Sequence, residues 1–142
     1  MIEKTFTASD GLQLFERRWA PEGQPRAAVV IVHGYGHHCG SFAEVAARLT
    51  ACGYAVFAFD QRGFGKSEGK RGYIASFDQT LADLDTYLAH ITADVAGLPL
   101  FLMGHSYGGL VLGIYVATRQ PAVQGLVFSS PLMKLSDDIS PL

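Results

Sequence analysis

The residues best suited to chemistry form the run Gly-His-Ser-Tyr-Gly at 104–108. Four apolar residues at 100–103 precede it and a helix-compatible run follows, so the pattern predicts a sharp turn from a strand into a helix. Such a turn holds its central serine in a strained backbone conformation and exposes the hydroxyl. Gly104 and Gly108 are small enough for the close approach that the turn requires. We therefore predict that Ser106 is a nucleophile, against the alternative of a glycine-rich turn with an incidental serine.

A serine that attacks an ester creates a tetrahedral oxyanion, which two preorganised N–H donors must stabilise. Tyr107 follows the serine at the start of the predicted helix, where the helix dipole also favours negative charge. The second donor is expected from the loop after the third strand, which reads His-Gly-Tyr-Gly-His-His at 33–38. Because Gly34 and Gly36 flank Tyr35, its amide can turn toward the site. The N–H groups of Tyr35 and Tyr107 are the predicted oxyanion hole.

The three histidines of the 33–38 loop raise the alternative of a metal site. His33 and His37 are four residues apart, but they lie in a loop rather than on a helix, and Cys39 stands alone beside them. No acidic or cysteine set at ligand spacing completes the group, so we predict no metal and no cofactor. His33 is expected to hold the loop by hydrogen bonding, and His37 and His38 are expected to line the pocket entrance.

Hydrophobic periodicity predicts the elements that would position these residues. An Asp-Gly turn at 10–11 joins two extended segments into a hairpin, and continuous apolar runs then alternate with runs of helical spacing. That alternation predicts an α/β fold, a mostly parallel sheet with helices on both faces. The predicted strands are 3–8, 12–19, 27–32, 55–59, 100–103 and 125–129, and the predicted helices are 41–52, 76–95 and 107–118.

Two capping pairs define the starts of the first two predicted helices, Ser41 with Glu44 and Ser76 with Gln79. Cys52 falls on the predicted apolar face of the first helix. The two cysteines of the chain are therefore expected to stay as free thiols rather than to pair.

Composition and charge exclude several classes of function. The 142 residues carry a formal net charge of −2 at pH 7, so the chain has neither a nucleic-acid footprint nor a polybasic membrane anchor. Its apolar runs are far shorter than the roughly 20 residues that span a bilayer. Residues 1–10 lack the apolar segment of a secretory signal, so the expected location is cytoplasmic.

Together with Asp-Gln-Arg-Gly-Phe-Gly-Lys-Ser-Glu-Gly at 60–69, the two motifs resemble the monoacylglycerol lipase and lysophospholipase-like branch of the serine α/β-hydrolases. The resemblance covers the whole chain, and three motifs in family order are more specific than any one of them. It implies that Ser106 is the nucleophile and that Tyr35 and Tyr107 supply the oxyanion N–H groups. It also implies that 60–69 is a structural loop in which Asp60 has no catalytic role.

Two positions depart from the family pattern. The family commonly has glutamate where this chain has His37, and often methionine where it has Tyr107. Both changes affect pocket shape more than chemistry. The implied substrate is a small-molecule ester or lipid of the monoacylglycerol or lysophospholipid type, which would bring peripheral membrane contact. Peptidase, thioesterase and small-ester esterase activities share the same core and stay open.

A serine hydroxyl needs a base that a carboxylate orients, and in this fold the chain order is serine, then acid, then histidine. No histidine follows Ser106. Asp137 and Asp138 fall where the resemblance places the start of the lid, so neither is proposed as the acid. His105 supports the turn but is expected to point away from its neighbour, and His90 lies on a remote helix. A makeshift base from the 33–38 loop is the alternative.

These observations predict that residues 1–142 form an incomplete α/β-hydrolase core that ends before the lid. Its sixth strand would be a bare apolar edge, which a missing C-terminal part or a second chain would cover. The predicted function is ester hydrolysis with acid and histidine supplied from outside, and inactivity of the segment alone. The alternative is a catalytically inactive half-domain that acts as a binding or oligomerisation module. Ser106 and its glycines favour the enzyme, because binding alone needs no strained serine.

Overall fold

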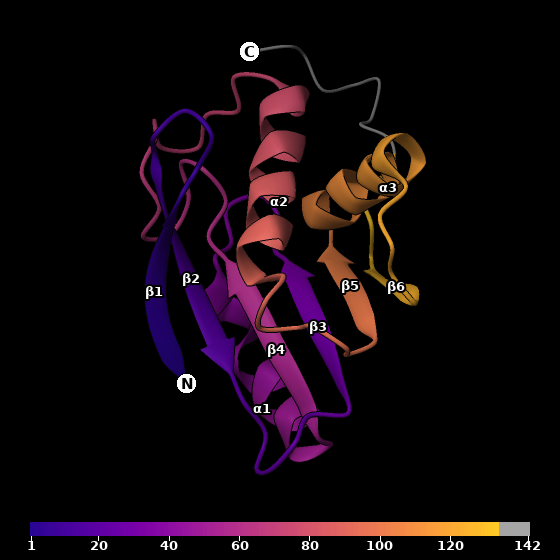
Figure 1. Cartoon of the computed structure of the whole chain (residues 1–142). Helices are drawn as coiled ribbons and strands as arrows, with labels where there is room; N and C mark the ends of the chain where they lie inside the picture. Colours follow the sequence, from indigo (N-terminus) through magenta and orange to yellow (C-terminus); the bar gives the residue numbers. More distant parts are fainter. Residues whose placement is uncertain (134–142) are drawn as a thin grey trace.

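The structure is a computed structural model that describes residues 1–133. A central β-sheet organises this part of the chain. Within that range the sheet is six-stranded, in the order β1-β2-β4-β3-β5-β6 (Figure 1). The strands are β1 (Ile2–Thr7), β2 (Gln13–Trp19), β3 (Ala27–Val32), β4 (Tyr54–Phe59), β5 (Leu100–His105) and β6 (Gly125–Ser129). The helices are the short 3₁₀ turn η1 (Cys39–Phe42), α1 (Ala43–Ala51), α2 (Phe77–Ile91) and α3 (Tyr107–Arg119).

The strands that lead into the candidate site are parallel. β4, β3, β5 and β6 lie side by side in one direction, whereas the β1–β2 hairpin joins them antiparallel through β2 and β4. The loops after β3, β4 and β5 therefore meet at one edge of the sheet, where ligands bind in open α/β sheets. All six residues of β3 are buried, which is typical of a parallel strand covered on both faces.

Helices cover both faces of the sheet (Figure 1). α1 packs on one face, over an apolar cluster that includes Ile31 and Ala46. α2 and α3 pack on the other face, over a larger cluster that includes Val30, Leu84 and Leu112. Neighbouring residues of β3 belong to opposite clusters because side chains alternate along a strand. The predicted fold class, a mostly parallel sheet between helices, is confirmed.

The start of the first helix differs from the prediction. Ser41 and Glu44 do not form a capping box, because a 3₁₀ turn occupies Cys39–Phe42 and α1 follows it without a side-chain cap. The cause lies outside the helix. The Asp60 carboxylate accepts the N–H of Cys39 at 2.6 Å, which fixes the chain two residues before Ser41.

The second capping pair is present as predicted, since the Ser76 hydroxyl accepts the N–H of Gln79 at 3.1 Å. α2 ends four residues before Val95, although that side chain still packs against the same apolar cluster. Cys52 is exposed rather than on the apolar face, because it lies at the C-cap of α1, past the last helical residue. Both cysteines are free thiols.

A buried carboxylate joins α2 to the sheet. Glu16 of β2 is fully buried and lies 2.8 Å from the Arg18 guanidinium and 3.0 Å from Nε2 of His90. Burial alone would raise the pKa of Glu16, but the hydrogen bonds from Arg18 and His90 lower it below its usual value. The His90 ring also stacks on Phe6 of β1, which contacts Tyr87 of α2 as well. His90 therefore fixes the helix, remote from Ser106 as predicted.

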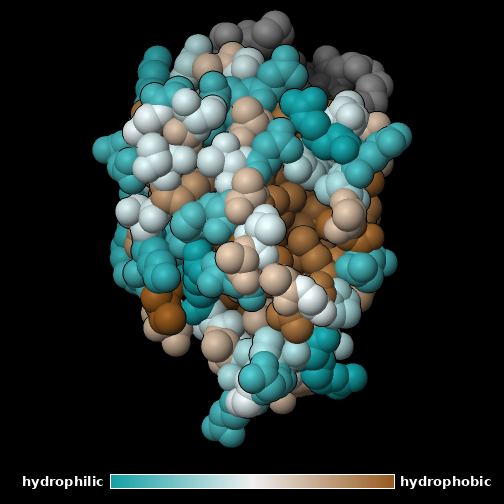
Figure 2. Space-filling model, in the orientation of Figure 1, coloured by the Kyte–Doolittle hydropathy of each residue, from teal (hydrophilic) through white to brown (hydrophobic). Residues whose placement is uncertain are grey.

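Apolar surface is exposed at two places. Figure 2 shows hydrophobic side chains gathered in a hollow beside the carboxyl-terminal half of α2. The other place is β6, where Val127 and Phe128 are 48% and 44% exposed. Among residues 1–133, β6 pairs with β5 alone. No helix within this range is long and apolar enough to cross a bilayer. The hollow beside α2 is lined by residues that include Leu88, Val95, Leu98, Leu100, Tyr115 and Val123.

Candidate active site

A sharp turn between β5 and α3 presents Ser106. Its φ of 50° and ψ of −117° lie in a region that residues other than glycine rarely adopt. The N–H of Ser106 donates to the carbonyl of Ser129 at 3.0 Å. The Ser106 carbonyl accepts the N–H groups of Gly109 and Leu132, each at 2.9 Å. The end of β6 and the first turn of α3 thus hold the strained residue in one place.

Two glycines permit this turn. A Cβ atom on Gly104 would lie 2.5 Å from the carbonyl oxygen of Gly108, and one on Gly108 would lie 2.1 Å from that of Val32. Both distances are far inside van der Waals contact, and the atoms met are backbone. The start of α3 therefore lies directly against the ends of β3 and β5.

The loop after β3 carries Tyr35 to the same place. The N–H of His37 donates to the carbonyl of Gly34 at 3.1 Å, and Gly36 has a φ of 75°. A positive φ at the third residue is the mark of a type II turn, with Tyr35 and Gly36 at its centre. A Cβ atom on Gly34 would lie 3.2 Å from Cβ of Ser106. The turn therefore runs beside the serine.

Tyr107 is the first residue of α3. Its N–H consequently has no partner within the helix, and the helix dipole favours negative charge at that point. The rings of Tyr35 and Tyr107 meet edge to face with 6.3 Å between their centroids. The structure therefore brings together the three residues that the sequence singled out, Ser106, Tyr35 and Tyr107.

His33 fixes the beginning of the Tyr35 loop. Its ring is 1% exposed, and Nε2 accepts the N–H of Gln61 at 2.9 Å while Nδ1 lies 2.7 Å from the carbonyl of Gly34. The Gln61 side chain also donates to the His33 carbonyl at 2.7 Å. This set of partners fits a neutral imidazole that is protonated at Nδ1. Burial lowers the pKa of His33 to about 4, so the ring stays neutral near pH 7.

Asp60 fixes the other end of that loop. Its carboxylate accepts the N–H of Cys39 at 2.6 Å and the N–H of Lys66 at 2.8 Å, and its carbonyl accepts the Ser67 hydroxyl. A Cβ atom on Gly65 would overlap the same carboxylate. Burial and the neighbouring Asp60 raise the pKa of the Cys39 thiol far above its usual value. Asp60 is thus committed to holding two loops, in agreement with its predicted structural role.

His105 is engaged by residues other than Ser106. Its Nδ1 atom lies 3.2 Å from the hydroxyl of Ser129, and its ring stacks on that of His37 with 5.5 Å between centroids. The rings of Phe42 and His105 meet edge to face with 6.0 Å between their centroids. Within residues 1–133 no hydrogen bond joins a histidine to the Ser106 side chain.

The histidines of the 33–38 loop do not converge on one point. His33 is buried against Gln61, whereas His37 stacks on His105 beside the serine. His38 lines a hollow together with Arg17, Cys39 and Asp60. In the described part of the chain, no group of three histidine, cysteine, aspartate or glutamate side chains could hold a metal ion.

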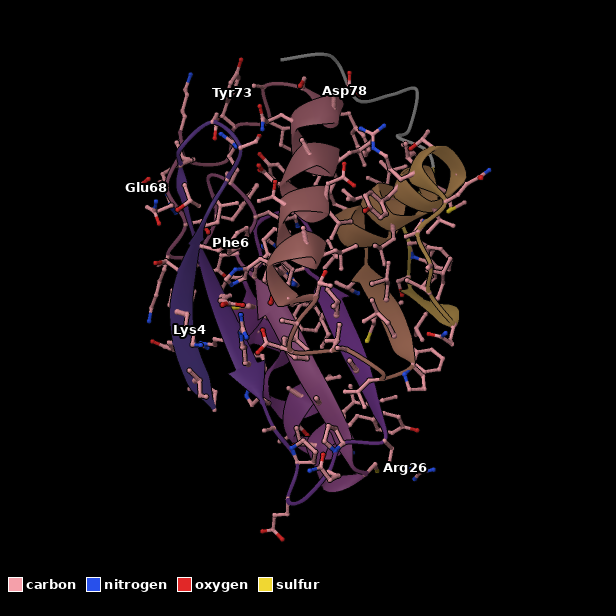
Figure 3. All side chains as sticks on the ribbon, viewed as in Figure 1. Lys4, Phe6, Arg26, Glu68, Tyr73 and Asp78 are labelled. Carbon is pink, nitrogen blue, oxygen red and sulfur yellow. The ribbon has the colours of Figure 1, made fainter. Side chains whose placement is uncertain are left out.

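A crevice lined in part by aromatic side chains lies beside Tyr107. The sequence did not predict this crevice. Phe64, Tyr73 and Thr80 line it, and the hydroxyl oxygens of Tyr107 and Thr80 are 3.4 Å apart. Burial raises the pKa of Tyr107. Tyr73 lies in the loop near the start of α2 (Figure 3). These residues come from separate elements, so only the aromatic content of 64–77 signals the crevice in the sequence.

The parallel sheet, the strained serine between β5 and α3, and the glycine-containing turn beside it define an α/β-hydrolase core. Residues 23–142 match the family described as serine aminopeptidase, S33. The chain belongs to this family.

Several known proteins that the chain is similar to are lipases. Mouse monoglyceride lipase is 38% identical over 125 residues, which cover 88% of this chain and 41% of that protein. A monoacylglycerol lipase of Mycolicibacterium smegmatis is 34% identical over 140 residues, covering 99% and 50%. The crystal structure of Paleococcus ferrophilus monoacylglycerol lipase matches with a TM-score of 0.75 at 35% identity, covering 89% and 46%. The chain thus spans half or less of the length of these relatives.

The contact between α3 and β3 predicts opposite effects of one substitution at two glycines of the same helix. Gly108→Ala should destabilise the fold by about 2–3 kcal/mol, because the added methyl overlaps the Val32 carbonyl. Gly113→Ala should stabilise it by about 0.5–1 kcal/mol, since a Cβ there meets no atom within 4 Å. Urea unfolding of both variants checks this, and equal effects of the two would contradict the geometry.

The buried neutral His33 predicts a loss of stability in acid. The unfolded chain takes up a proton near pH 6.5, whereas the folded chain takes it up near pH 4. The free energy of unfolding should therefore fall by about 3 kcal/mol from this group as the pH drops from 6.5 to 4, and level off below. An NMR titration of the His33 ring in the folded protein is the direct measurement. A midpoint near pH 6.5 would show the assignment to be wrong.

Proposed function

We propose that this chain carries the nucleophile and oxyanion hole of a serine hydrolase that cleaves carboxylic esters of the monoacylglycerol or lysophospholipid type. The observation that carries the proposal is the strained backbone of Ser106 at a strand-to-helix turn. Such strain costs roughly 1–3 kcal/mol, and a residue with no chemical role would have no need of it. The turn at Tyr35 and the first N–H of α3, which has no partner within the helix, are the proposed donors to the oxyanion that an attacking serine creates.

In the proposed reaction the Ser106 hydroxyl attacks the ester carbonyl carbon and gives its proton to a base. The carbonyl oxygen becomes an oxyanion, which the N–H groups of Tyr35 and Tyr107 stabilise. Collapse of this intermediate releases the alcohol, which takes up the proton, and leaves an acyl-Ser106 ester. Water then repeats the sequence, which releases the fatty acid and restores the serine.

The base and its acid are proposed to come from outside these residues. No histidine follows Ser106, and His33, His90 and His105 have the other partners described above. Asp137 and Asp138 lie outside the described residues. Relatives about twice as long as this chain have room for the missing groups. Without those groups, we expect the 142 residues alone to be inactive.

The choice of substrate rests on the relatives. Two of them are called monoglyceride or monoacylglycerol lipases, which suggests esters of a single fatty chain and peripheral contact with a lipid surface. The family name, serine aminopeptidase, keeps an amide substrate as the competing possibility. Esters and amides pass through the same tetrahedral oxyanion, so the described site serves either reaction.

A second candidate function is a binding or oligomerisation module without catalysis. The exposed apolar residues Val127 and Phe128 favour it, because β6 pairs on one side only among residues 1–133 and such an edge can accept a strand from a second chain. The two candidates make different predictions about Ser106, because only the hydrolase needs its hydroxyl.

Hydrolysis assays on the purified protein that contains this chain separate the candidates. We expect fatty acid release from monoacylglycerol, with a fall in kcat of roughly 10⁴-fold or more in Ser106→Ala. Ser9→Ala, an exposed serine in the β1–β2 turn, should keep the wild-type rate. Cleavage of aminoacyl amides but not of esters would replace the lipase proposal by the peptidase. Equal rates for Ser106→Ala and wild type would exclude the proposed nucleophile.

A further inference from the structure

The side chain of Tyr35 makes contacts that its role as an amide donor does not require. Its hydroxyl donates to the carbonyl of Gly72 at 2.7 Å. Its ring meets Phe64 edge to face at 5.1 Å and Tyr107 at 6.3 Å. Tyr35 is 57% exposed, so these contacts rather than burial hold the side chain in place.

We propose that the phenol of Tyr35 is a positioning group, an anchor that fixes the orientation of the turn whose N–H stabilises the oxyanion. The inference rests on the proposed hydrolase function and deepens it. It assigns the side chain of Tyr35 a task separate from that of its backbone, and it makes the loop that contains Gly72 part of the oxyanion hole's support.

The need for an anchor follows from how the loop is held. Its first residue, His33, is fixed by Gln61, and its last part is fixed where Asp60 accepts the N–H of Cys39. Between these points the hydrogen bond from His37 to Gly34 closes the turn on itself and does not tie it to another element. Besides the stacking of His37 on His105, the Tyr35 side chain ties the turn to another segment, by its hydrogen bond to Gly72.

The partner of the anchor is itself firmly placed. Gly72 has a φ of 63°, and its N–H donates to the carbonyl of Gly63 at 3.1 Å. The Arg71 guanidinium next to it donates to the carbonyls of Gly65 and Ser67 at 2.7 and 2.6 Å. This loop is attached in turn to the end of β4, as described for Asp60. The hydrogen bond to the Gly72 carbonyl therefore links the Tyr35 turn, through this loop, to the sheet.

The expected consequence concerns the transition state more than substrate binding. Donors stabilise an oxyanion only when they already point at the position where the charge develops. A turn that can rock loses part of this alignment, while contacts with the ground-state ester hardly change. Loss of the anchor should therefore lower kcat and leave KM nearly unchanged.

The first test is Tyr35→Phe, which removes the hydroxyl and keeps the ring. In the active protein we expect kcat to fall about three- to tenfold, with KM within about twofold of wild type. Tyr35→Ala, which also loses both ring contacts, should lower kcat further. Tyr54→Phe removes a hydroxyl at the start of β4, away from the site, and should leave both constants unchanged. An unchanged kcat in Tyr35→Phe would overturn the proposal.

The second test does not depend on activity. Hydrogen exchange of the His37 amide reports the hydrogen bond that closes the turn, because exchange requires that bond to open. We expect faster exchange in Tyr35→Phe than in wild type or Tyr54→Phe. Unchanged exchange would overturn the anchor even in a protein that hydrolyses esters. A wild-type protein that hydrolyses nothing would overturn the proposed function, whereas the exchange rates would still decide whether the anchor exists.

Discussion

The backbone contact between the start of α3 and the ends of β3 and β5 is the constraint on which the site depends. Gly108 touches the Val32 carbonyl so closely that no side chain fits, and Gly104 faces Gly108 in the same way. Between these two glycines Ser106 has its positive φ, and it lies beside Gly34 in the loop that leaves β3. The cost of the strain is offset by the parallel ladders of β5 with β3 and β6, which hold the turn from both sides.

Two buried polar side chains hold the loops next to this contact in place. His33 and Asp60 lie just after β3 and β4. The His33 ring accepts the backbone N–H of Gln61, and the Asp60 carboxylate accepts those of Cys39, at the start of η1, and Lys66. Buried polar groups that are fully hydrogen-bonded make a loop rigid. Because the His33 ring and the Asp60 carboxylate already accept these backbone N–H groups, neither is proposed as the base for Ser106.

Much of the framework could be predicted from the sequence, because its signals are local. The apolar runs at 27–32 and 125–129 gave strands with the observed bounds, and the glycine spacing around Ser106 marked the turn. The start of α1 was predicted wrongly, because the preceding Cys39 is held by Asp60, which lies 21 residues further along the chain. The aromatic group around Tyr35 was missed for the same reason, since its members come from three segments that only the folded sheet brings together.

The central claim, that Ser106 is the nucleophile, is tested most directly by covalent labelling. A fluorophosphonate phosphonylates an activated serine, and an intact-mass spectrum counts the adducts. For the protein that contains this chain we predict one adduct, absent from Ser106→Ala and retained in Ser9→Ala. An adduct that survives in Ser106→Ala would contradict the claim and assign the chemistry to another residue.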